Sequence, residues 1–224
     1  MGIDVIRILD EILVDSLYVE KITHGYTNKA GNIIRPADTN GHIVISKQFD
    51  KKEIYIVGPW SSATPLAYSA DAEIIWIRLR LGTRLSATPT ILYTNHELLI
   101  PNLSDSKIEY NQTVLSIPDF NDIDLFIEKL TNISFFSCNR IINDVMAGSN
   151  PKMASRTLRK YFLNTTGLSR ERIYQIQRSK QAWIMLKEGL SINDVIFELG
   201  YYDQSHLTNN LRRYLGLTPG QISK

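Results

Sequence analysis

The chain of 224 residues contains one cysteine, Cys138, and has neither internal repeats nor low-complexity tracts. A single thiol cannot form an internal disulfide framework or a thiolate metal cluster, and this cysteine usage fits a reducing cytoplasm. No uninterrupted apolar run follows the N-terminus, because Asp4, Arg7 and Asp10 interrupt it. We therefore expect a cytoplasmic protein with no signal peptide and no membrane-spanning helix.

Motifs of catalysis and metal binding are also absent. The sequence has no glycine-rich phosphate loop, no His-Glu-x-x-His motif and no paired cysteines. His24, His42 and His96 stand far apart and lack the His-x-His spacing that is typical of a metal site. We therefore expect no catalytic residue, no metal and no cofactor, and we do not expect an enzyme.

The net charge is small, but the charges are unevenly distributed along the chain. The formal net charge is +2; residues 1–118 have 11 basic and 13 acidic side chains, whereas residues 119–224 have 14 and 10. From residue 150 onward the counts are 12 and 5. Because phosphate groups are bound by cations, this basic excess makes the last third of the chain the candidate region for binding a nucleic acid.

The first half of the chain has the pattern of short strands. Apolar residues form one stripe over residues 3–14, which predicts an amphipathic helix. Runs rich in Ile, Val, Tyr and Trp then predict strands over 18–23, 32–35, 42–46, 53–57, 65–69, 73–81 and 90–93. Many short strands at close spacing predict a small barrel or sandwich. Arg78 and Arg80 share one side of their strand, where they either hold an anion in the barrel or form a solvated face.

The pattern changes at Pro118. Apolar residues at helical spacing follow it, first over residues 123–130 and then over residues 135–145. With 43% hydrophobic residues, the chain can bury the cores of two small domains. We predict an α+β protein with a β-rich, barrel-like N-terminal domain, residues 1–118, and an all-α C-terminal domain, residues 119–224.

Two helices joined at a glycine are predicted near the C-terminus. Ser191 caps a helix that stops at Gly200, and Asp203 caps a second helix over about residues 203–215. The second helix has an apolar face and a polar face, formed respectively by Leu207, Leu211, Tyr214 and Leu215 and by His206, Asn209, Asn210 and Arg213. This arrangement is the helix-turn-helix layout, in which the second helix enters the major groove of DNA.

A further helix with two different faces is predicted over about residues 154–163. Leu158, Tyr161 and Phe162 share its apolar side, and the opposite side is cationic, with Arg156, Arg159 and Lys160. Between this helix and the C-terminal pair, residues 170–188 predict one continuous helix capped by Ser169. Such a helix is roughly 28 Å long, close to the spacing of about 34 Å between successive major grooves on one DNA face.

These stretches resemble a known family. Residues 200–207, Gly-Tyr-Tyr-Asp-Gln-Ser-His-Leu, and residues 212–219, Arg-Arg-Tyr-Leu-Gly-Leu-Thr-Pro, closely resemble the second helix-turn-helix of AraC/XylS-type transcription regulators. Residues 154–169 resemble the first recognition helix and its turn. Residues 35–41, 57–60 and 77–82 are similar to the small cupin-like domain that precedes the helix-turn-helix in one branch of the family, without the clustered histidines and glutamate of metal-binding cupins.

The resemblance implies a bacterial, sequence-specific transcription regulator that inserts two recognition helices into double-stranded DNA. It implies base-edge contacts from Arg156, Arg159, Lys160, Ser205, His206 and Asn209. Phosphate contacts are expected from Gln204, Thr208 and Arg213, and Ser155 completes the DNA-binding set. Arg178 is expected to form a structural ion pair. Further partners that the family suggests are RNA polymerase, a small-molecule effector and a second copy of the chain bound through the N-terminal domain; no membrane partner is expected.

Two departures from the family pattern keep a second hypothesis open. Gly148, Asn150 and Pro151 disfavour a regular helix where the supporting helix of the first motif is expected. Asn209 stands where the family usually has an arginine, which weakens a guanine contact there. The alternative is a helix-turn-helix fold that serves as a protein-interaction module or anti-regulator without sequence-specific DNA binding.

Overall fold

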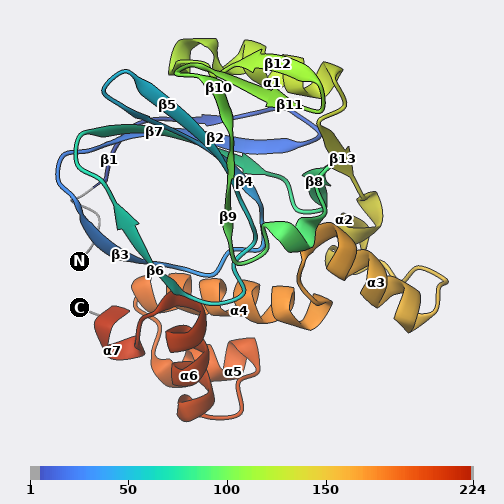
Figure 1. Cartoon of the computed structure of the whole chain (residues 1–224). Helices are drawn as coiled ribbons and strands as arrows, with labels where there is room; N and C mark the ends of the chain where they lie inside the picture. The colour runs from blue at the N-terminus through green and yellow to red at the C-terminus, as the bar shows by residue number, and fades with distance from the viewer. Residues whose placement is uncertain (1–5, 223–224) are drawn as a thin grey trace.

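The computed structural model describes residues 6–222. Its N-terminal region is β-rich and its C-terminal region is helical, as predicted (Figure 1). The strands are β1 (Ile6–Leu13), β2 (Val19–Thr27), β3 (Gly31–Arg35), β4 (His42–Gln48), β5 (Lys51–Val57), β6 (Thr64–Tyr68), β7 (Ala72–Leu79), β8 (Thr83–Leu85), β9 (Glu97–Ile100), β10 (Asn102–Ser104), β11 (Lys107–Tyr110), β12 (Thr113–Ser116) and β13 (Phe136–Cys138). The α-helices are α1 (Ile123–Asn132), α2 (Arg140–Met146), α3 (Ser155–Thr166), α4 (Arg170–Lys187), α5 (Ile192–Leu199), α6 (Gln204–Leu215) and α7 (Pro219–Ile222).

The main sheet has six strands in the order β1-β2-β7-β4-β5-β9, and its pairings are antiparallel. Three smaller sheets complete the β-rich region: β3 with β6, β8 with β13, and β10 with β11 and β12. The main sheet curves over the β3–β6 pair, and α4 runs below this curved body (Figure 1). We refer to the curved body as the barrel.

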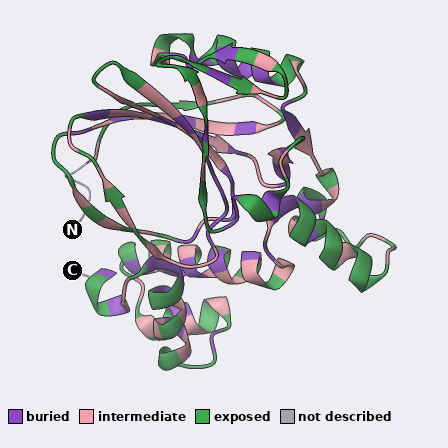
Figure 2. Ribbon diagram, in the orientation of Figure 1, coloured by how far each residue is buried: buried purple, intermediate pink, exposed green. Residues whose placement is uncertain are grey.

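The core of the barrel follows from alternation along its strands. In β7, Ile75, Ile77 and Leu79 are buried, while Trp76 and Arg78 between them face the other side and are half-buried. The buried face packs against α1, which contributes Ile123, Phe126, Ile127 and Leu130 to the same cluster. Buried residues accordingly follow the sheet where it meets this layer (Figure 2). Helix α1, although it follows Pro118, is thus part of the core of the strands.

The amphipathic helix predicted over residues 3–14 is wrong for residues 6–13, which form strand β1; residues 3–5 lie outside the described part. β1 pairs with β2, and the register shifts between Ile8 and Asp10, so Leu9 is an extra residue in the ladder. Every residue of β1 after Ile6 is exposed, so the apolar spacing of this segment does not mark a buried helical face. The strand forms because β2 offers it a free backbone edge, which the apolar pattern does not show.

Two other segments differ from their predictions. Residues 90–93, predicted as a strand, contain a single 3-10 turn, η1 (Thr90–Leu92). The helical spacing predicted from residue 135 begins instead as strand β13, whose backbone pairs with β8. Both segments contribute to the barrel core, the first through the buried Tyr93 and the second through the buried Phe135 and Phe136. A second 3-10 turn, η2 (Phe120–Asp122), leads into α1.

The remaining helices have two small cores of their own. Helices α2 and α3 and the first half of α4 share a cluster that includes Ile142, Val145, Phe162, Ile173 and Ile176. The second half of α4 packs with α5, α6 and α7 around Ala182, Leu186, Val195, Leu207 and Leu211. Helix α4 therefore joins two helical units. No helix within residues 6–222 combines the length and apolar character needed to cross a bilayer.

The barrel contacts the ends of the helices directly. The backbone amides of Ala37 and Ala63 donate to the carbonyl oxygens of Tyr214 and Arg213, at 2.7 and 2.8 Å, in the last turn of α6. The Thr90 hydroxyl donates to the Asn164 carbonyl oxygen in α3 at 3.0 Å. The last carbonyl groups of a helix have no partner within the helix. The barrel supplies such partners to both α3 and α6.

We predict that replacing Gly216 with alanine destabilises the protein more than replacing Gly200. Both glycines have positive φ angles, 71° and 65°, so each alanine variant carries a left-handed strain of about 1–2 kcal/mol. A Cβ at Gly216 would collide with Ile34 of β3, whereas nothing lies within 4 Å of one at Gly200. Unfolding midpoints of the two variants test this. Equal losses would mean that the barrel does not rest against the end of α6.

Candidate nucleic-acid interface

Helix α3 presents a packed face and a free cationic face. Phe162 is buried and Leu158 packs beside it, while Arg156, Arg159 and Lys160 are exposed. Among the described residues, none of these three cations has a hydrogen bond or an ion pair. Ser155, which the sequence places in the DNA-binding set, is exposed in the first turn. The charges on this face are therefore available to an external anion.

Helix α2 supports α3 from upstream of the irregular segment. Asn139 caps α2 by accepting from the Ile141 amide at 3.2 Å, and its side-chain amide lies 3.4 Å from the Thr165 hydroxyl in α3. Ile142 and Val145 of α2 pack with Phe162. The Gly148–Pro151 segment, which we expected to disfavour the supporting helix, instead forms the connection after it. The first motif consists of the seven-residue helix α2, a connection longer than the one between α5 and α6, and α3.

Helices α5 and α6 form the second motif with the caps that the sequence predicts. Ser191 and Asp194 form a reciprocal capping box, and Gly200 ends α5 in the left-handed conformation. Asp203 caps α6 by accepting from the His206 amide at 2.7 Å. Leu207, Leu211, Tyr214 and Leu215 are buried. Local hydrogen bonding thus determines where both helices begin.

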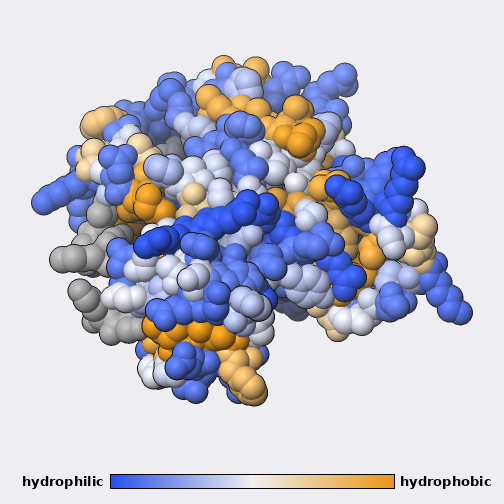
Figure 3. All heavy atoms as spheres, turned by 90° about the horizontal axis from the view of Figure 1, so that it is seen from below, coloured by the Kyte–Doolittle hydropathy of each residue, from blue (hydrophilic) through white to orange (hydrophobic). Residues whose placement is uncertain are grey.

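The outward face of α6 is centred on Ser205, Asn209 and Arg212, which are exposed at spacings of four and three. Gln204 and Arg213 are exposed beside it, and Thr208 is half-buried. Sequence reasoning missed Arg212, although its position seven residues after Ser205 is a signal that it shares this face. Seen from below, the surface of the molecule is largely hydrophilic and has separate apolar patches (Figure 3).

His206 and Asn210 turn from this face toward α4. The His206 ring accepts from the Tyr202 amide at 3.3 Å through Nδ1, and its Nε2 lies 3.5 Å from the Arg178 guanidinium. The Asn210 side chain donates to Gln175 at 3.3 Å. The ring nitrogens of His206 are therefore engaged inside the protein, so a base contact from this residue requires these bonds to change.

Arg178 is structural, but the predicted ion pair is wrong within the described residues. Its guanidinium donates to the Gly200 carbonyl oxygen at 3.4 Å and to Gln175 at 3.1 Å, and its Cζ lies 4.1 Å from the centre of the Tyr201 ring. Arg178 therefore contacts neutral acceptors and an aromatic ring in place of the carboxylate that an ion pair would need. Arg178 thereby joins α4 to the turn between α5 and α6.

A half-buried carboxylate of the barrel, Asp38, connects to the same helix. Asp38 forms two hydrogen bonds with Arg78, each of 3.0 Å, and lies 3.2 Å from the Lys180 ammonium of α4. Burial alone raises the pKa of Asp38, but a hydrogen bond from His42 and the charges of Lys180 and Arg78 outweigh burial and hold this pKa well below its ordinary value. The ionised carboxylate therefore links the barrel to α4.

Arg78 and Arg80 fit neither of the two sequence interpretations. Arg78 is paired with Asp38 and with Glu20, the latter at 3.0 Å. Arg80 donates to the carbonyl oxygens of Ser16 and Val14, at 2.6 and 3.1 Å. Both are engaged in internal contacts rather than solvated. In the described part of the chain, no three His, Cys, Asp or Glu side chains gather as metal ligands would.

Comparison with protein-family models finds a helix-turn-helix domain over residues 151–224, about a third of the chain. The C-terminal region is a helix-turn-helix domain of the AraC type. Such domains belong to DNA-binding transcription regulators rather than to an enzyme family. The AraC-type domain spans α3 to α7, so it includes the linker helix α4 and the whole second motif.

Solved structures similar to the chain include ToxT from Vibrio cholerae. One ToxT structure has a TM-score of 0.40 and 9% identity, covering 90% of this chain and 96% of that one. A second, from strain O395, has a TM-score of 0.38 and 11% identity, covering 90% and 95%. No curated protein matches the sequence significantly.

We predict that Asp38→Asn lowers the stability at pH 7 by about 1–3 kcal/mol, because Arg78 and Lys180 lose a charged acceptor. The folded pKa of Asp38 lies below its unfolded value of about 3.9, so its contribution is complete above that value and is lost progressively as the pH falls below it. The variant should thus lose less stability on acidification. Denaturant titrations at pH 7 and pH 3 measure this.

The matched control for Asp38 is Asp144→Asn, which removes an exposed carboxyl in α2. It should leave the pH dependence of stability unchanged. An Asp38→Asn protein with the parent's pH dependence would show that the carboxylate does not hold the barrel to α4.

Proposed function

We propose that the protein is a sequence-specific transcription regulator that binds double-stranded DNA with both helix-turn-helix motifs. In this proposal α3, the predicted recognition helix at about 154–163, and α6, the one predicted at about 203–215, enter successive major grooves. The observation that carries the proposal is the exposed cationic face of α3, whose Arg156, Arg159 and Lys160 have no carboxylate within ion-pair distance among the described residues.

The linker helix supports a two-site mode of binding. Helix α4 has 18 residues, which corresponds to about 27 Å, and successive major grooves on one face of DNA are about 34 Å apart. Its two halves are built into the separate cores of the two motifs. A rigid helix of this length therefore suits two recognition helices that bind one turn apart.

The proposal assigns roles by chemistry. Arginine forms bidentate pairs with guanine, and asparagine does so with adenine, so Arg159 and Asn209 are the best candidates for base contacts. Gln204, Thr208 and Arg213 are assigned to phosphates, together with the newly identified Arg212. We assign His206 to positioning, because its ring already contacts Tyr202 and Arg178.

The division of the chain at Pro118 remains a prediction, with α1 and β13 packed on the barrel side.

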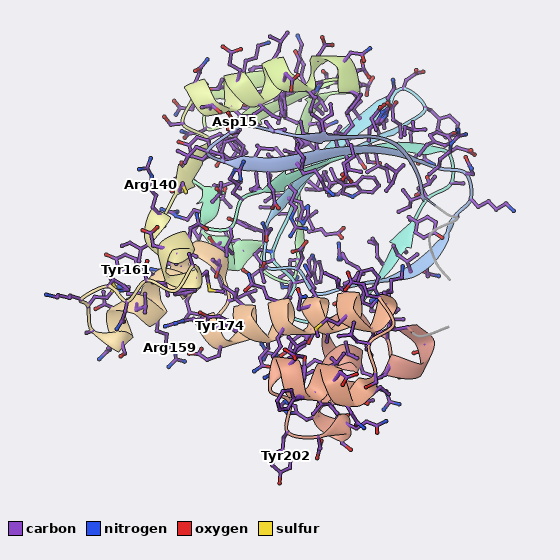
Figure 4. The ribbon with its side chains drawn as sticks, turned by 180° about the vertical axis from the view of Figure 1, so that it is seen from behind. Asp15, Arg140, Arg159, Tyr161, Tyr174 and Tyr202 are labelled. Carbon is purple, nitrogen blue, oxygen red and sulfur yellow. The ribbon has the colours of Figure 1, made fainter. Side chains whose placement is uncertain are left out.

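The second candidate function is a protein-interaction module. Phe197 in α5 and Tyr202 in the turn after it are 84% and 88% exposed, and large exposed aromatic side chains are typical of protein interfaces. Both lie in the second motif, and Tyr202 projects from its tip (Figure 4). An anti-regulator bound through this tip would need no sequence-specific DNA contact.

Selection from a random pool of DNA duplexes tests the function directly. We expect two short conserved blocks about one helical turn apart, and binding that weakens steeply as the salt concentration rises. One block would mean that a single motif contacts bases. No enrichment, or binding that salt does not affect, would favour the protein-interaction function.

Arg159→Ala should cost about 1–3 kcal/mol of binding at one base pair of the selected sequence and relax specificity there. Arg159→Lys is the matched control, because it keeps the charge but loses the planar fork that pairs with guanine. Competition binding against duplexes substituted at each position measures both. If the alanine variant loses the same affinity on every duplex and the lysine variant loses none, Arg159 contacts only phosphate.

A further inference from the structure

The first half of α4, the helix that connects the two motifs, has a pair of interacting side chains at its surface, Arg170 and Tyr174. The Arg170 guanidinium donates to the Tyr174 hydroxyl at 3.4 Å, and its Cζ lies 5.4 Å from the centre of the Tyr174 ring. Tyr174 is 40% exposed and Arg170 is half-buried. Among the described residues, Arg170 has no carboxylate within ion-pair distance. The pair is therefore not explained by the packing of α4.

The residues next to this pair on α4 interact with both α3 and α6. Glu171, next to Arg170, lies in the electrostatic field of Arg159 on α3. One turn further along α4, Gln175 accepts from Asn210 of α6. Figure 4 shows Arg159 and Tyr174 near the junction of α3 and α4, and Tyr202 at the tip of the second motif. The pair thus occupies the surface that runs from one motif to the other.

The geometry of duplex DNA determines what faces this surface. When two recognition helices occupy successive major grooves, the sugar-phosphate strands that border the intervening minor groove lie against whatever connects the helices. Arginine N–H groups and tyrosine hydroxyls are common donors to phosphate oxygens. We propose that Arg170 and Tyr174 bind these phosphates, so that α4 is a third, sequence-independent DNA contact. This inference rests on the proposed function.

Glu171 supplies an opposing charge at the same place. Its pKa is lowered, because its carboxylate accepts hydrogen bonds from its own backbone amide and from Ser169 and lies near Arg159 and Arg170. It is therefore ionised at neutral pH and repels a nearby phosphate. Removing its charge should strengthen DNA binding, an effect that damage to the fold cannot produce.

The test measures the affinity of the full chain for a selected duplex and for a random duplex of the same length, over a range of salt concentrations. Arg170→Ala should make the plot of log K against log salt less steep by about 0.9, the value of one phosphate contact. It should weaken binding to both duplexes by the same factor. Tyr174→Phe, which removes the hydroxyl but keeps the ring, should weaken binding to both duplexes equally. Glu171→Gln should strengthen binding to both.

The matched control is Lys187→Ala at the other end of α4. Lys187 is an exposed cation whose Nζ lies 4.9 Å from the centre of the Trp183 ring, and its removal should leave the slope unchanged. An unchanged slope for Arg170→Ala, or no gain from Glu171→Gln, in a protein whose parent binds DNA would overturn the linker contact alone. Failure of the parent chain to bind either duplex would overturn the proposed function, and this inference with it.

Discussion

The carboxylate of Asp38 is the point at which the barrel and the linker helix meet. Its side chain is 16% exposed and is paired with Arg78 and His42 of the barrel and with Lys180 of α4. A buried charge is stable only when it is paired, so the strands that carry Arg78 and His42 and the helix that carries Lys180 constrain one another. Because α3 precedes α4 and α5 follows it, the placement of both motifs against the barrel depends on this contact.

The barrel also binds the carbonyl ends of α3 and α6. Ala37 and Ala63 donate to the end of α6, and Thr90 donates to the end of α3. Each helix therefore has one end fixed to the barrel, and its polar side remains exposed. A structural change in the barrel would reach both helices at their ends, without contact with the surface proposed for DNA.

The sequence predicted features that are fixed by chemistry within a few residues. The caps at Ser169, Ser191 and Asp203 and the glycine stop at Gly200 are where the pattern predicts them, because side-chain hydrogen bonds and backbone freedom are local properties. The helix prediction failed at the N-terminus, where apolar residues at helical spacing form the exposed edge strand β1. The strand formed by residues 136–138 was missed because it exists only through pairing with β8.

The sequence by itself determined the order of β-rich and helical regions, the caps of the helices and the cationic face of α3, since each depends on residues that are neighbours along the chain. Tertiary structure decided which side of α6 is free. Gln175 and Arg178 draw Asn210 and His206 toward α4, which leaves Ser205, Asn209 and Arg212 facing outward. Helical periodicity shows that two faces differ, but only packing against a second helix selects the face that remains exposed.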